Sequence, residues 1–141
     1  TNRDLDLILG YMDDFYAIDN YPFDVDKSRS NLEDFLANAS LGIMFLVHKV
    51  SHPVGYLALT FGYSFEYGGR DAFIDEFYLI EEARGQGTGS VVMKLLEEQA
   101  KKYNVKAIHL EVEPHNFRGN RIYQKAGYVS NDRTLMTRRI D

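Results

Sequence analysis

Arg84-Gly85-Gln86-Gly87-Thr88-Gly89 is the stretch from which the fold of this chain can be argued. It follows an apolar, strand-like run and opens an amphipathic helix. Its three glycines let the backbone approach a ligand closely, because glycine has no Cβ. The free N–H groups and the dipole of the helix N-terminus point at the same place, which suits a phosphate or pyrophosphate group. The stretch therefore predicts a site for a nucleotide-like cofactor.

Length, charge and cysteine content limit the classes of protein to consider. The 141 residues favour one domain over 1–141, and the formal net charge of −5 argues against nucleic acid or an anionic membrane as partner. The absence of cysteine excludes a disulfide, a thiolate nucleophile and a cysteine-ligated metal site. We see no apolar run long enough to span a membrane and no signal peptide, and so expect a cytoplasmic protein.

Hydrophobic periodicity predicts the helices and strands along the chain. Helices are expected at 3–18, 27–39, 87–103 and 117–126. Strands are expected at 43–50, 54–65, 72–80 and 107–112, with a closing hairpin of 128–131 and 135–139. Hairpins come first and a β-α-β-α-β series follows, so the order predicts a mixed α+β sheet rather than a regular βαβ fold.

Two familiar nucleotide motifs fit the glycine stretch poorly. A P-loop needs Lys followed by Ser or Thr after its glycines, and neither pair occurs here. A dinucleotide fingerprint fits better, because Gly85 and Gly87 precede the acid Glu111 at a suitable distance. Ser90, however, stands where its third glycine belongs, and about fifty residues are too few for the rest of a doubly wound sheet. A nicotinamide-dependent oxidoreductase therefore stays only as an alternative.

A third motif extends well beyond the loop. Residues 84–89 follow the pattern Arg-x-x-Gly-x-Gly, where x is any residue. This pattern resembles the acetyl-CoA signature of the GNAT superfamily of N-acetyltransferases. Ile74–Leu79 resembles the strand that precedes the loop in that family, and Leu110–Val112 with Asn116 resembles the next strand. Ile122–Tyr128 resembles its closing helix. Four elements in the right order make the resemblance specific.

The resemblance implies an acetyl-CoA-dependent N-acetyltransferase with a mostly antiparallel, twisted sheet flanked by helices. In that family two parallel strands splay apart at the cofactor, and backbone groups of the preceding strand pair with the pantetheine amides. The chain departs from the family at its start, where a first strand is usual. Either that strand precedes Thr1 or the sheet lacks one edge strand.

The resemblance also assigns residues to the cofactor. Arg84 is expected either at a phosphate or at the surface, and Asn116 either at the pantetheine arm or in a turn. The full set implied is Phe77, Tyr78, Leu79, Arg84, Gly85, Gln86, Gly87, Thr88, Gly89, Ser90, Asn116 and Tyr123.

Acetyl transfer to an amine needs a base for the amine proton and an acid for the departing thiolate. By resemblance Tyr123 is the general acid, and otherwise it is a core residue of the last helix. Glu76 and Glu111 are both candidates for the base, acting through water. Asp75 is a third, and a regular pleat would point it to the opposite side of the strand from Glu76. Any of the three could instead be a solvated or salt-bridged carboxylate.

The acceptor is expected to be a small cationic amine, such as a polyamine or an amino sugar. Acidic residues lie beside aromatic residues in the segments before the cofactor strand, and both kinds of side chain attract cations. A solvated acidic face over core aromatics would give the same sequence pattern. Two further alternatives stay open: a peptide or protein acceptor, and a domain that binds acetyl-CoA without turnover. The resemblance also allows a homodimer, although the sequence shows no interface for it. The four histidines form no metal-binding motif, so no metal is expected.

Overall fold

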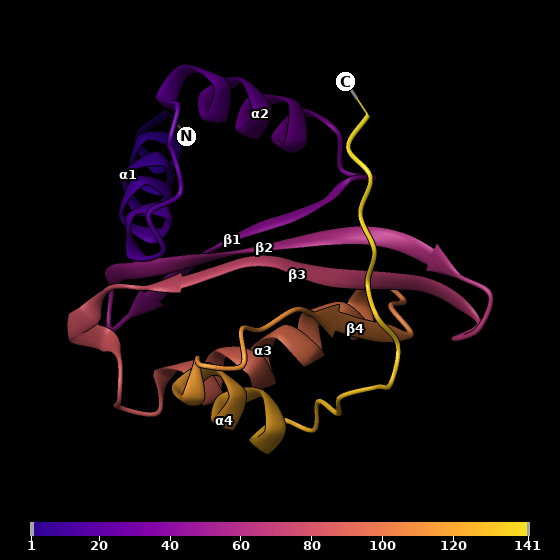
Figure 1. Cartoon of the computed structure of the whole chain (residues 1–141). Helices are drawn as coiled ribbons and strands as arrows, with labels where there is room; N and C mark the ends of the chain where they lie inside the picture. The colour runs from indigo at the N-terminus through magenta and orange to yellow at the C-terminus, as the bar shows by residue number, and fades with distance from the viewer. Residues whose placement is uncertain (1, 141) are drawn as a thin grey trace.

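The computed structural model describes residues 2–140 as a mixed sheet between two layers of helices (Figure 1). Helices α1 and α2 lie on one face of the sheet, and α3 and α4 lie on the other. The elements are α1 (Asn2–Ile18), α2 (Val25–Ala37), β1 (Gly42–Lys49), β2 (His52–Ser64), β3 (Gly69–Leu79), a short 3-10 turn (Glu81–Ala83), α3 (Thr88–Lys102), β4 (Ala107–Leu110) and α4 (Phe117–Lys125). None of these helices combines the length and apolar character needed to cross a membrane.

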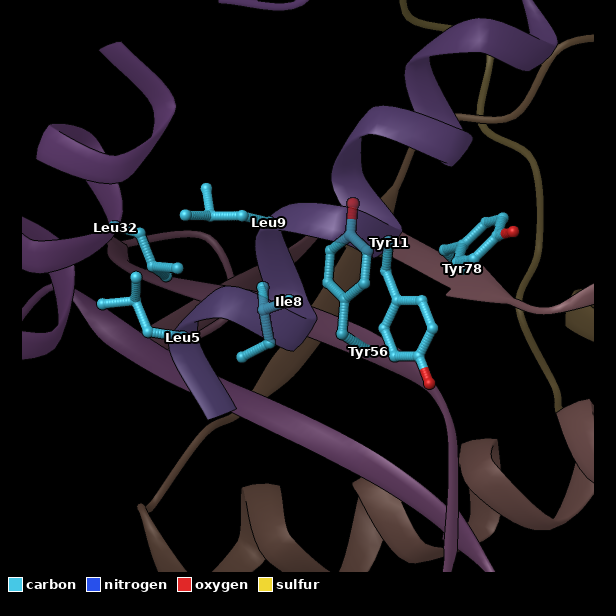
Figure 2. Packing of buried hydrophobic residues seen from close by; sticks show 7 residues of the cluster. All are labelled: Leu5, Ile8, Leu9, Tyr11, Leu32, Tyr56 and Tyr78. Atoms are coloured by element: carbon cyan, nitrogen blue, oxygen red, sulfur yellow. The ribbon is translucent and has the colours of Figure 1, made fainter. Parts of the chain in front are cut away.

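Helix α1 is held against the sheet by an apolar stripe at helical spacing. Leu5, Ile8 and Leu9 are buried on that stripe and pack with Tyr56 of β2 and Tyr78 of β3. Figure 2 shows these side chains with Leu32, which α2 adds to the same cluster. The cluster fixes α1 over the middle strands, and this places its C-terminal turn beside the end of β3.

The sheet order is β1-β2-β3-β4, antiparallel except for the last pair. The parallel pairing between β3 and β4 covers only residues 71–74 and 107–110. Strand β3 runs on to Leu79 with no partner on that side, so the two parallel strands part after Ile74 and Leu110. The expected mixed sheet is confirmed, and the parallel pair separates at the place where the cofactor was predicted.

A β-bulge interrupts β3 at Asp75. Ala58 pairs with Glu76 and Leu59 with Ile74, so Asp75 has no partner across the strand. A bulge of this kind changes which face the following side chains occupy. Ile74 packs with the α3 cluster, whereas Tyr78 packs with the α1 cluster. The bulge thus directs the end of β3 toward α1.

The closing hairpin expected at 128–131 and 135–139 is wrong. Residues 128–140 contain no strand, and both Val129 and Met136 are 89% exposed. An extended segment becomes a strand only by pairing with an edge, and β4 ends at Leu110, two residues short of the expected Val112. The segment instead passes the sheet toward the side of α1 and α2 (Figure 1). Along it, Arg133 forms a bidentate ion pair at 2.6 and 2.8 Å with Glu66, which lies in the turn between β2 and β3.

Candidate functional site

The glycine stretch forms an open loop between β3 and α3. Gly85 and Gly87 adopt left-handed φ values of 75° and 79°, which L side chains rarely adopt, and a Cβ at either would meet nothing within 4 Å. Gly87 is the N-cap of α3, and no side chain caps the helix there. The first N–H groups of α3 are therefore available to an anion, as the phosphate prediction requires.

The loop is tied to its surroundings through two of its residues. The Gln86 side chain donates to the Glu82 carbonyl at 2.8 Å and accepts from the Lys49 ammonium at the end of β1. Gly89 lies against α4, because a Cβ there would stand 2.8 Å from Ile122 Cδ1. This close approach seats the helix that carries Tyr123 beside the start of α3.

Arg84 is folded back onto β3 instead of extending from the loop. Its Nε donates to the Leu79 carbonyl at 2.9 Å, and its guanidinium carbon lies 5.5 Å from the Tyr78 ring centroid. The two roles expected for Arg84, a phosphate contact and a surface position, stay predictions. Its contacts hold the end of β3 to the loop.

Asn116 is the N-cap of α4. Its side-chain oxygen accepts from the Gly119 N–H at 2.9 Å, and this satisfies one of the unpaired N–H groups that begin a helix. The contact with the pantetheine arm stays a prediction. The N-cap also orients α4 and with it Tyr123.

Tyr123 is half-buried against the α3 cluster, with its ring 5.9 Å from that of Tyr128. No residue in the described range 2–140 forms a hydrogen bond with its hydroxyl group. Burial raises the pKa of Tyr123, so the phenol keeps its proton at neutral pH. A protonated phenol without a partner is free to donate to a ligand.

Glu76 is held from two sides by tyrosine hydroxyl groups. Tyr16 of α1 donates to Oε2 at 2.7 Å, and Tyr56 of β2 donates to Oε1 at 2.8 Å. Burial raises the pKa of Glu76 above its usual value, while the two tyrosine hydrogen bonds act in the opposite direction and the nearby Asp75 adds to the rise. The carboxyl group is fixed in place and titrates closer to neutral pH than an exposed glutamate.

Glu76 lies in the wall of a pocket of about 520 Å³ at the C-terminal end of α1. Asp75 lines the same pocket, so the two carboxyl groups do not point to opposite sides, as a regular pleat would require. The bulge explains the difference, because neighbouring residues at a bulge can share one side of the strand. The other lining residues are Phe15, Tyr16, Asp19, Tyr21, Pro22 and Arg139.

Glu111 is exposed and follows directly on the last residue of β4. It therefore stands at the far edge of the opening between β3 and β4, and not in the pocket with Glu76. Among residues 2–140 no group of three or more acidic or histidine side chains could hold a metal ion. His109 instead pairs with Asp71 at 3.1 Å near the other end of β3.

The two strongest catalytic candidates lie on opposite faces of the sheet. Glu76 bonds to α1, and Tyr123 packs with the α3 cluster. Beyond Ile74 and Leu110 the strands β3 and β4 no longer pair, so the opening between them connects the two faces of the sheet. A cofactor entering from the α3 side and an acceptor entering from the α1 side would meet in that opening.

Comparison with known proteins agrees with this geometry. The acetyltransferase (GNAT) family profile matches residues 9–128, and the chain belongs to this family. Over 60 residues it is 36% identical to an uncharacterized N-acetyltransferase, YdgE, of Bacillus subtilis; the match covers 43% of this chain and 38% of that protein.

Solved structures share the fold over nearly the whole chain. An integron cassette protein from the mobile metagenome of Cole Harbour Salt Marsh superposes with a TM-score of 0.87 at 26% identity, over 98% of this chain and 86% of that one. A predicted acetyltransferase from Clostridium acetobutylicum, solved with acetyl-CoA, gives a TM-score of 0.79 at 21% identity, over 96% and 90%. These structures share the fold, and the family match over residues 9–128 confirms the resemblance to the GNAT acetyltransferases.

Proposed function

We propose that the protein transfers the acetyl group of acetyl-CoA to the primary amine of a small molecule. The observation that supports this proposal is the edge of β3 that has no partner strand beyond Ile74. This edge leads to the glycine loop, whose helix has no side-chain cap, and the acidic pocket lies on the opposite face of the sheet from that helix. The residues fit acetyl-CoA, because the loop offers N–H groups to the pyrophosphate and the edge offers backbone groups to the pantetheine amides.

Acetyl-CoA supplies the acetyl group as a thioester. Backbone groups of Phe77, Tyr78 and Leu79 lie on the open stretch of β3 and would pair with the pantetheine arm. Residues 85–89 and Ser90 would bind the pyrophosphate through their N–H groups. In this proposal Arg84 and Asn116 act indirectly, by holding the loop to β3 and by capping α4.

Glu76 is our choice as the base. An alkyl amine has a pKa near ~10.4, so at neutral pH it must lose a proton before it can attack a carbonyl carbon. Glu76 is fixed, lies in the pocket and has a raised pKa, all of which suit a base that accepts a proton directly or through one water. Glu111 stands outside that pocket and is the second choice.

Tyr123 is our choice as the acid, because its hydroxyl is unpaired and stays protonated. As the new N–C bond forms and the C–S bond breaks, the amine proton passes to Glu76 and the Tyr123 hydroxyl donates a proton to the sulfur.

The acidic residues of the pocket support an acceptor that carries an ammonium group, since Asp19, Asp75 and Glu76 all line the pocket.

Replacement of Tyr123 by Phe tests this assignment. We expect kcat to fall by about 10²-fold, since general acids commonly contribute that much, while the Kd for acetyl-CoA stays within twofold. The assay follows coenzyme A release with a panel of small primary amines, and Tyr103→Phe, on the exposed end of α3, is the matched control. Unchanged turnover under conditions in which the chemical step is rate-limiting would show that Tyr123 is not the general acid. Activity on peptide N-termini alone would show that the acceptor is a peptide or protein and not a small amine. Binding of acetyl-CoA without turnover of any amine would show that the domain is a non-catalytic module.

A further inference from the structure

The pocket that contains Glu76 carries both signs of charge. Asp19 and Asp75 line it as carboxylates, and Arg139 reaches it from the C-terminal segment. The three residues are far apart in the sequence: Asp19 directly follows α1, Asp75 is the bulge of β3, and Arg139 lies beyond α4. The fold therefore assembles a mixed-charge pocket that no local motif indicates.

These opposite charges do not neutralise one another. No ion pair within 4.0 Å joins Arg139 to an acid of the described range 2–140, although three carboxyl groups line the same pocket. An arginine that served only to balance the acids would form such a pair, as Arg133 does with Glu66. The guanidinium and the carboxylates thus remain available to a ligand at the same time.

We propose that the acceptor is an amino carboxylic acid, whose carboxylate binds Arg139 while its ammonium group faces the acids. This inference rests on the proposed function and narrows its substrate class. A diamine would bring a second cation to Arg139, which costs energy, whereas a carboxylate matches the planar guanidinium with two parallel hydrogen bonds. A phosphate dianion fits less well, because three carboxyl groups and only one arginine line the pocket.

The test compares acceptors that differ only in the carboxylate. ω-Amino acids of five and six carbons are each paired with their primary amides, because an amine that far from the carboxyl group keeps nearly the same pKa in both, and 1,5-diaminopentane is added. With acetyl-CoA saturating, we expect kcat/KM for the best acid to exceed that of its amide by at least about tenfold, the usual size of a charge-assisted contact. In Arg139→Gln the ratio of the two kcat/KM values should fall to about one.

Arg138→Gln is the matched control, because Arg138 is the exposed neighbour of Arg139 and does not line the pocket. It should keep the wild-type ratio. A wild-type ratio near one, a diamine better than every acid, or an unchanged ratio in Arg139→Gln would each overturn the inference.

A binding measurement separates this inference from the proposed function. Acids and amides are titrated calorimetrically into the protein with saturating coenzyme A. If no amine is acetylated, the proposed function fails, yet tighter binding of the acid that depends on Arg139 would still support the amino-acid pocket. Equal binding of acid and amide would contradict it even in an active enzyme.

Discussion

At the scale of single residues, the environment of Glu76 decides what the pocket can do. Its two carboxyl oxygens each accept one hydrogen bond, from Tyr16 and from Tyr56, and each keeps a lone pair for another donor. Burial and Asp75 raise its pKa, and the tyrosines oppose that rise. These opposing contributions can be removed one at a time.

Tyr16→Phe and Asp75→Asn are expected to move the acidic limb of the kcat/KM–pH profile in opposite directions. If ionised Glu76 is the base, activity falls as pH drops through its pKa. Tyr16→Phe removes a hydrogen bond that lowers this pKa, so the limb moves to higher pH. Asp75→Asn removes a negative charge that raises it, so the limb moves to lower pH.

Glu76→Gln should abolish that limb and lower kcat by about 10²-fold. Tyr63→Phe, an exposed tyrosine on the far part of β2, serves as control and should leave the profile unchanged. Shifts in the same direction, or a wild-type limb in Glu76→Gln, would show that another group is the base.

The sequence indicates Glu76 as a candidate base but does not indicate its hydrogen-bond partners. Glu76 was a candidate because it lies on the strand before the loop. Tyr16 and Tyr56 lie 60 and 20 residues away from it, and only the packing of α1 on the sheet brings them together. Helical spacing places Tyr16 on α1, but nothing local in the sequence pairs it with a carboxylate.

At the scale of elements, the start of α3 depends on the backbone of Gly87. Its left-handed φ of 79° turns the chain into the helix and leaves the first N–H groups facing outward. An L side chain in that conformation costs about 1–2 kcal/mol. Because the space around it is empty, strain and not a clash would be the effect of a substitution.

Gly87→Ala is therefore expected to weaken acetyl-CoA binding by about tenfold or more and to lower stability by about 1–2 kcal/mol. Gly10→Ala is the matched control, since Gly10 also has nothing within 4 Å but lies inside α1. That change should stabilise the protein by about 0.5–1 kcal/mol and leave the acetyl-CoA Kd unchanged. Calorimetric titration and urea unfolding give both quantities; equal Kd values in both variants would contradict the role of the loop.

Periodicity predicted most elements to within a few residues, because one buried face per helix or strand leaves a regular apolar pattern. Two features escaped it. The bulge at Asp75 adds one unpaired residue inside β3, so the apolar positions on the α3 side run from Ala72 and Ile74 to Phe77, a step of three that strict alternation does not predict. The closing hairpin failed because alternation in 128–140 says nothing about whether a strand edge is there to pair with.

At the scale of the whole molecule, the C-terminal segment adds Arg139 to the pocket that contains Glu76, where we propose that the acceptor binds. Arg133 holds it to Glu66 in the turn between β2 and β3, and Arg139 then reaches the pocket at the end of α1. Arg133 lowers the pKa of Glu66, so this contact holds above that pKa and is lost as pH falls through it.

Arg133→Ala should loosen this segment without disturbing the cofactor side. We expect faster proteolysis within 129–140 and a KM for the acceptor raised severalfold, with the acetyl-CoA Kd unchanged. Limited proteolysis and steady-state kinetics measure these effects, and Arg138→Ala provides the comparison. If the proteolysis rate and the acceptor KM of Arg133→Ala equal those of the wild type, the ion pair does not position the segment.

The whole arrangement requires that acetyl-CoA bind along β3 with its pyrophosphate at residues 85–90. The thermal unfolding midpoint, measured with saturating acetyl-CoA and separately with NAD, tests this most directly. A ligand at about 100 times its Kd adds roughly 2.7 kcal/mol, or about 5–10 °C for a domain of this size. We expect that rise with acetyl-CoA and none with NAD. No rise with acetyl-CoA, or a rise with NAD alone, would contradict the account.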